Sequence, residues 1–198
     1  MNTVTTTLTT TAHFSEDGAK RYLLEKTWDS TKPKLTIIML APSAASGITL
    51  DSTTTLVLNN ASRLGYGSVA IVNLFATLND FALKHAEDAD AENLNAILAS
   101  VKAADRIVYA PGVGKANSKI FQRRQEQVLN ALRPYEARLS CLCDSNGLSR
   151  LQHPLSPAVK TWYLSDLKVS ELVEDTKRTI TVPGKKKSKP KAAPTITT

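Results

Sequence analysis

The fold is decided by residues 35–47, which read LTIIMLAPSAASG. The first six residues, from Leu35 to Leu40, are apolar or β-branched, and none of them is charged. A short unbroken apolar run predicts a strand that is covered on both faces, as in a parallel sheet. The residues that follow are small, and Pro42 restricts the turn. Because ligands of open α/β sheets bind beyond the carboxyl ends of such strands, this loop is either a binding loop or a plain connection to the next helix.

Apolar runs and amphipathic segments alternate along the rest of the chain. Helical spacing of apolar residues predicts helices over 51–64, 89–101 and 118–133. Short apolar runs predict strands over 69–72, 106–110 and 139–143. The segment 13–28 fits either a strand or a helix, and a final helix is expected to begin within 159–163. This alternation predicts an α/β fold, a three-layer sandwich around a central, mostly parallel four-stranded sheet.

Composition divides the chain into one domain with two tails. Residues 1–12 are rich in threonine and are expected to be disordered, residues 13–176 form the α/β domain, and residues 177–198 form a lysine-rich flexible tail. The net charge is +7, of which five lysines between residues 185 and 191 contribute +5, so the remainder carries only +2. The basic tail favours contact with nucleic acid, whereas the modest charge of the domain favours a small-molecule ligand.

Cysteine content and hydropathy exclude several classes of protein. Cys141 and Cys143 are too few for a disulfide framework or a four-cysteine cluster. The Thr-rich start has no basic region of the kind that opens a signal peptide, and no apolar run approaches the roughly 20 residues of a membrane span. We therefore expect a cytoplasmic protein without a metal or another cofactor and without membrane contact; its oligomeric state stays open.

Two polar residues stand at places where a ligand would bind. Asn73 ends the apolar run 69–72, where its amide either caps a turn or contacts a ligand. His153 lies in the stiff, proline-flanked stretch QHPLSP, where it is either a structural histidine or a functional one. Asp51 precedes the first predicted helix, and either Asp51 or Ser52 is a natural N-cap.

The chain resembles the DUF1643 proteins, a bacterial and phage family of unassigned function. The resemblance covers residues 13–163 and rests on short motifs. These are RYxL from Arg21, LAPS from Leu40, Asp51 with Thr53, GYG from Gly65 followed by NLFA from Asn73, and HPL from His153.

The layout is also similar to that of the uracil-DNA glycosylase superfamily. The similar features are Ala41-Pro42-Ser43 after the first core strand, Asn73 at the end of the next strand, the loop 109–117, and the stretch 153–157. This resemblance implies a DNA glycosylase, a hydrolase that removes a modified or unusual base. His153 would stabilise the leaving base, Asn73 would bind its edge, and Asp51 would orient or deprotonate the attacking water.

The same resemblance implies which residues bind substrate. The pocket wall would comprise Ala41, Pro42, Ser43 and Ser46, and Phe75 is a candidate for stacking on the base. Nucleic acid would be bound by Lys115 and by tail lysines Lys185, Lys186 and Lys187.

One departure keeps other functions open. Ala41 stands where many glycosylases have Asp or Asn beside the proline of this loop. A nucleic-acid-binding module without catalytic activity, and an enzyme that acts on a free nucleoside or nucleotide, are therefore the alternatives.

Overall fold

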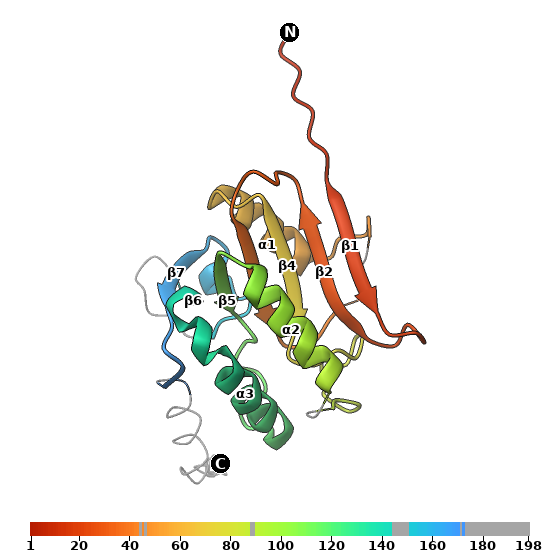
Figure 1. Ribbon diagram of the computed structural model, residues 1–198, viewed down its shortest axis with the longest axis vertical. Helices are drawn as coiled ribbons and strands as arrows, with labels where there is room; N and C mark the ends of the chain where they lie inside the picture. Colours follow the sequence, from red (N-terminus) through yellow and green to blue (C-terminus); the bar gives the residue numbers. More distant parts are fainter. Residues whose placement is uncertain (44, 46, 88–89, 144–150, 171, 173–198) are drawn as a thin grey trace, which may run out of the picture.

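A computed structural model describes residues 1–43, 45, 47–87, 90–143, 151–170 and 172 of the chain. A single sheet runs through the molecule, with helices on both of its faces (Figure 1). The strands are β1 (Thr9–Phe14), β2 (Arg21–Thr27), β3 (Lys34–Met39), β4 (Ser68–Asn73), β5 (Arg106–Tyr109), β6 (Leu139–Cys143) and β7 (Tyr163–Asp166). The helices are α1 (Ser52–Arg63), α2 (Ala91–Ala103) and α3 (Lys119–Leu132), with short 3₁₀ helices at Arg133–Arg138 and Pro157–Val159.

The sheet is mixed and has seven strands in the order β1-β2-β4-β3-β5-β6-β7. The four central strands β4, β3, β5 and β6 are parallel, as the alternation of strands and helices predicts. The outer strands β1, β2 and β7 pair antiparallel with their neighbours. The expectation of a mostly parallel, four-stranded sheet is therefore wrong, because three further strands pair antiparallel; only the four central strands are parallel.

Both faces of the central strands are buried, which explains why β3 has no polar alternation. Ile37 packs with Val57 of α1 on one face, and Ile38 packs with Ile97 of α2 on the other. Figure 1 shows α2 and α3 together on one side of the sheet and α1 on the opposite side. These side chains are fully buried, so two apolar cores fix the three layers.

The segment 13–28, which the sequence left as strand or helix, belongs to a β-hairpin. β1 begins at Thr9, so the end of the Thr-rich segment expected to be disordered is a strand. The register shifts near the turn: His13 pairs with Leu23, but Phe14 pairs with Arg21. Tyr22 is left over in this β-bulge, and an extra residue reverses the side to which the following side chains point. Arg21 consequently lies on the α1 side of the sheet, beside the loop after β3.

The expected helix within 159–163 is wrong, because only a short 3₁₀ turn forms before the chain enters β7. Trp162 is fully buried in the core on the α1 side. Asn60 of α1 holds this segment: its Nδ2 donates to the carbonyl of Lys160 (3.0 Å), and its Oδ1 accepts from the N–H of Trp162 (2.9 Å). Pairing with β6 then satisfies the backbone of β7, which a short helix here would have left to solvent.

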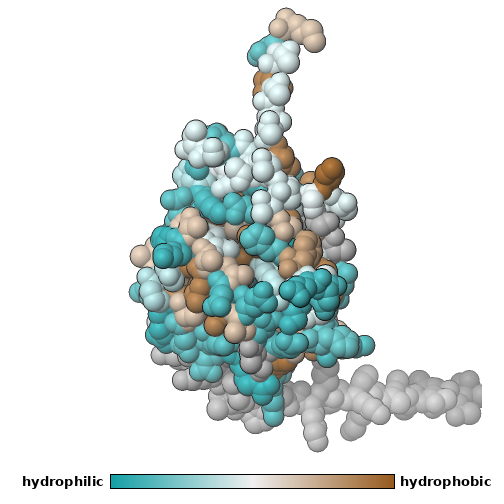
Figure 2. Space-filling view, turned by 45° about the vertical axis from the view of Figure 1, so that its right-hand side comes forward, coloured by the Kyte–Doolittle hydropathy of each residue, from teal (hydrophilic) through white to brown (hydrophobic). Residues whose placement is uncertain are grey.

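Figure 2 shows a face on which hydrophilic side chains predominate and hydrophobic ones form small groups. No helix in the described part of the chain is both long and apolar enough to cross a membrane. The lysine-rich tail expected over residues 177–198 lies outside the described residues.

Candidate functional site

A cavity of about 360 Å³ opens beyond the carboxyl end of β3. The chain leaves β3 toward α1 on one face of the sheet, whereas it leaves β5 toward α3 on the other. Such diverging loops form the crevice in which α/β proteins bind their ligands. The lining comes from β2, β3 and its loop, the start of α1, and two later loops. It consists of Arg21, Met39, Ala41, Ser43, Asp51, Ser52, Thr53, Thr54, Phe81, His153 and Leu155.

Asp51 faces this cavity and also begins α1. Its backbone is extended (φ −94°, ψ 173°), and its carboxylate accepts a hydrogen bond from the N–H of Thr54 at 2.6 Å. Partial burial raises the pKa of Asp51, but hydrogen bonds from Ser43 and Thr54 and the charge of Arg21 outweigh it, so the pKa is lowered. The N-cap is thus an ionised carboxylate at neutral pH. The structure gives Asp51 the capping role and places it in the cavity as well.

His153 presents a neutral imidazole to the same cavity. Its Nδ1 accepts a hydrogen bond from the N–H of Leu155 at 3.2 Å, so the proton of the neutral ring is on Nε2. Burial lowers the pKa of His153, although the charge of Asp51 acts in the opposite direction. The ring is supported from the loop after β5, because a Cβ on Gly112 would lie 3.2 Å from the Cβ of His153. A larger residue at 112 would therefore push on the histidine.

Arg21 is the most deeply buried charge in the lining, with 3% of its surface exposed. Its Nη1 donates to the carbonyl of Ser43 (3.2 Å) and to that of Ala45. Lys26 of the same strand donates to the carbonyl of Gly47 (2.6 Å), so two cations of β2 hold the loop after β3. Burial lowers the pKa of Arg21 to about 10, against the effect of Asp51, and the side chain stays charged at neutral pH. The RYxL motif marks Arg21 in the sequence, but nothing there indicates its place in the site.

A second cavity of about 470 Å³ adjoins the first. The two share Ala41, Phe81, His153 and Leu155. The loop after β5, from Pro111 to Lys115, lines the second cavity but not the first. Lys115 therefore lies along a groove that passes His153.

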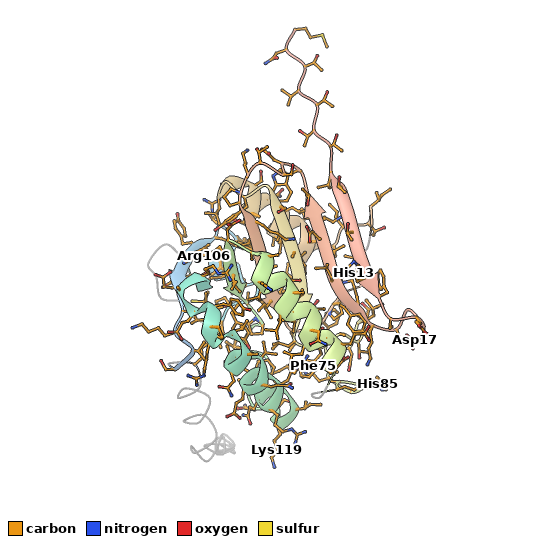
Figure 3. All side chains as sticks on the ribbon, in the orientation of Figure 1. His13, Asp17, Phe75, His85, Arg106 and Lys119 are labelled. Atoms are coloured by element: carbon orange, nitrogen blue, oxygen red, sulfur yellow. The ribbon has the colours of Figure 1, made fainter. Side chains whose placement is uncertain are left out.

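The aromatic residue at this groove is Phe81 and not Phe75. Phe81 is 51% exposed and lines both cavities, whereas Phe75 is 1% exposed and packs in the core on the side of α2 and α3. Figure 3 shows Phe75 near the carboxyl ends of the strands, the same end as Lys119. Sequence reasoning missed Phe81 because it stands alone in the irregular segment between β4 and α2, where no periodicity marks its direction.

The other residues predicted to bind substrate do not all lie at the cavity. Ala41 and Ser43 line the cavity, while Pro42 is buried beside it and its carbonyl accepts the N–H of Asn79. Asn73 is 1% exposed and is not among the lining residues; its amide makes no hydrogen bond to a described residue, so it caps no turn there. Ser46 and the three tail lysines lie outside the described residues.

In the described ranges, no group of three or more His, Cys, Asp or Glu side chains is placed to hold a metal ion. The polar side chains that line the cavity are instead one carboxylate, one imidazole, one guanidinium and several hydroxyls.

Comparison with known proteins assigns the chain to a family. A family model described as "Protein of unknown function (DUF1643)" matches residues 21–155. The chain belongs to the DUF1643 family. The match begins at Arg21 and ends at Leu155, and both residues line the cavity of this DUF1643 protein. Comparisons with curated proteins and with solved structures gave no match, so the likeness to uracil-DNA glycosylases stays a prediction.

Proposed function

We propose that this DUF1643 protein hydrolyses the N-glycosidic bond of a nucleotide, acting on DNA as a glycosylase that removes a modified or unusual base. One observation carries the proposal: an ionised carboxylate, Asp51, and a neutral imidazole donor, His153, line the same cavity. The volume of about 360 Å³ lies within the range of small-ligand sites.

The two groups match the charges that develop when this bond breaks. The base leaves with the bonding electron pair, so negative charge grows on the base and positive charge on the sugar. The Nε2–H of His153 donates to the base and stabilises the first charge, and the carboxylate of Asp51 stabilises the second. Water then supplies a hydroxyl group to the sugar and a proton to the base. Because its pKa is lowered, Asp51 acts mainly through its charge and by orienting this water, and less as a proton acceptor.

Other features of the groove support a nucleic-acid substrate. The exposed ring of Phe81 is placed where a base turned out of its strand could stack. Lys115 lines the adjoining cavity, where it could meet a neighbouring phosphate. The charge of +2 on the chain before its terminal lysines instead favours a free nucleoside or nucleotide, which is the second candidate substrate.

Abasic-site formation tests the proposal. Purified protein is incubated with single- and double-stranded DNA that contains uracil, hypoxanthine or phage-type modified pyrimidines, and the products are cleaved with alkali. We expect strand breaks at one base with the wild type and a loss of about a hundredfold or more with His153→Ala. The matched control is His85→Ala, because His85 is exposed and does not line either cavity.

The outcomes separate the candidate functions. Breaks that need His153 but not His85 would support the glycosylase. Release of a free base from nucleosides or nucleotides, with none from DNA, would favour the second candidate. Retention of DNA without release from any substrate would identify a binding module and contradict the catalytic proposal.

A further inference from the structure

The guanidinium of Arg21 is a buried cation without an ion pair to any carboxylate in the described part of the chain. All its hydrogen bonds to described residues come from Nη1, and its buried Nε has no partner there. In a guanidinium the Nε–H and one N–H of Nη2 point the same way, and this edge binds two oxygens of one phosphate or carboxylate. A buried donor that lacks a partner is costly unless a ligand supplies one.

The start of α1 provides a second set of donors in the same cavity. Asp51 accepts the N–H of Thr54, but the N–H groups of Ser52 and Thr53 have no acceptor among the described residues. Both residues line the cavity together with Arg21. The first N–H groups of a helix and its positive dipole end form an anion site when a ligand reaches them. α1 has twelve residues, so this dipole is well developed.

We propose that Arg21 and the first turn of α1 bind one phosphate group of the substrate. This inference rests on the proposed function and deepens it, because it makes the substrate a nucleotide and excludes an uncharged nucleoside. The phosphate is either the monoester of a free nucleotide or a diester of DNA, and both present the same oxyanion. Its oxygens meet the guanidinium of Arg21 and the N–H groups of Ser52 and Thr53.

Among the described residues that line this cavity, Asp51 is the one with a negative charge. Its position lowers the affinity for phosphate but does not prevent binding. Its carboxylate is bonded to Thr54 and is turned toward Ser43 as the N-cap. The carboxylate and the phosphate repel each other, so inorganic phosphate alone should bind weakly. A nucleotide that also fills the rest of the cavity should bind more tightly.

The sharpest test removes a single backbone donor. Ser52 is the first residue of α1, a position that proline suits, and the extended backbone of Asp51 is the conformation preferred before proline. Ser52→Pro therefore deletes the N–H while α1 stays intact. Ser52→Ala keeps the N–H and removes only the hydroxyl. Ala91→Pro makes the same change at the first residue of α2, which does not line the cavity.

Binding is measured by isothermal titration calorimetry with four probes: inorganic phosphate, a nucleoside 5′-monophosphate, the matching nucleoside, and a short single-stranded DNA without a terminal phosphate. We expect the monophosphate or the DNA to bind more tightly than the nucleoside, and Ser52→Pro to weaken that binding about fivefold or more. Ala91→Pro should bind as the wild type does, and Ser52→Ala should weaken binding clearly less than Ser52→Pro does. Dependence on Ser52 for the monophosphate indicates a monoester site, and dependence for the DNA alone indicates a diester site.

Arg21→Gln provides a second measurement, with Arg106→Gln as the charge-matched control. Figure 3 shows Arg106 at the end of the sheet opposite Phe75, and Arg106 pairs there with Asp166. We expect tenfold or greater weakening for Arg21→Gln only. Arg21 also holds the loop after β3, so the Ser52 series decides the matter where Arg21→Gln does not fold.

The proposal is overturned if neither the monophosphate nor the DNA binds more tightly than the nucleoside, if Ser52→Pro binds as Ser52→Ala does, or if no probe binds at millimolar concentration. Phosphate binding that depends on Ser52, without base release from any substrate, would leave this subsite standing while the glycosidic function fails. If Ser52→Pro changes neither base release nor binding, the phosphate subsite fails while the glycosidic function stands.

Discussion

Replacing Asp51 separates its structural role from its chemical one. Asp51→Asn keeps a side-chain oxygen that can accept the N–H of Thr54, which the carboxylate now accepts at 2.6 Å, but it removes the charge. Asn and Asp are about equally good N-caps, so the change of cap should alter the free energy of unfolding by only a few tenths of a kcal/mol, and any further loss at neutral pH is the contribution of the charge. Asp51→Ala removes the cap and should lower the free energy of unfolding by about 1 kcal/mol.

The effect on catalysis should follow the charge and not the cap. If Asp51 stabilises the positive sugar, both variants should lose about a hundredfold or more in the rate of base release, despite their different stabilities. Stability is measured by urea unfolding and the rate by alkali cleavage of the product DNA.

The pH dependence of unfolding provides an independent check. The pKa of Asp51 is lowered in the folded protein, so its charge contributes stability above the unfolded value of about 3.9, and this stability is lost as the pH falls below that value. Asp51→Asn should therefore lose less stability than the wild type between pH 5 and pH 3. Asp51→Asn with the activity of the wild type would refute the proposed role of the charge, whatever its stability.

Three further predictions concern stability. Asn60→Ala leaves two backbone groups of the C-terminal segment without partners and should cost about 2–4 kcal/mol in urea unfolding, against less than about 0.5 for the exposed Asn59→Ala. A cost below 1 kcal/mol would show that water replaces these bonds. Gly67→Ala places a Cβ 1.9 Å from the carbonyl oxygen of Asp29, and a loss of about 1–3 kcal/mol is expected in thermal unfolding; an unchanged Tm would contradict this contact. The pKa of His153 is lowered by burial, so the folded state loses stability as the pH falls below about 6.5. His153→Gln should reduce this loss, and an identical profile from pH 7 to 5 would argue against a buried ring.

The parallel centre of the fold could be predicted because its signals are local. The apolar runs of β3, β4, β5 and β6 contain nearly all of the residues that form those strands, and the predicted helices agree with α1, α2 and α3 to within about two residues at each end. The antiparallel strands could not be predicted from local sequence, because their pairing depends on partners elsewhere in the chain. Half of the residues of β1 are threonine, and this segment becomes a strand only beside β2, as β7 becomes one only beside β6.

The site was harder to predict than the fold, because its residues converge from segments more than a hundred positions apart. Asp51 and His153 were singled out by their local context, and the structure places both at one cavity. Arg21 was hidden because its direction depends on a β-bulge that no residue type signals. Asn73 ends its strand as expected, but it is buried outside the lining of the cavity, since the direction of a side chain at a strand end is set by neighbouring strands.

The alanine at position 41 does not deprive the cavity of an acid. Ala41 lines both cavities, and its small side chain leaves space at the point where the loop after β3 begins. Ten residues later Asp51 returns to the same cavity at the start of α1, where hydrogen bonds from Ser43 and Thr54, together with the charge of Arg21, lower its pKa against the effect of burial. An acid placed on a helix N-cap is held by the fold itself, because the bond that orients it also begins the helix. The departure that argued against catalysis in the sequence therefore changes where the carboxylate comes from, while the cavity still contains one.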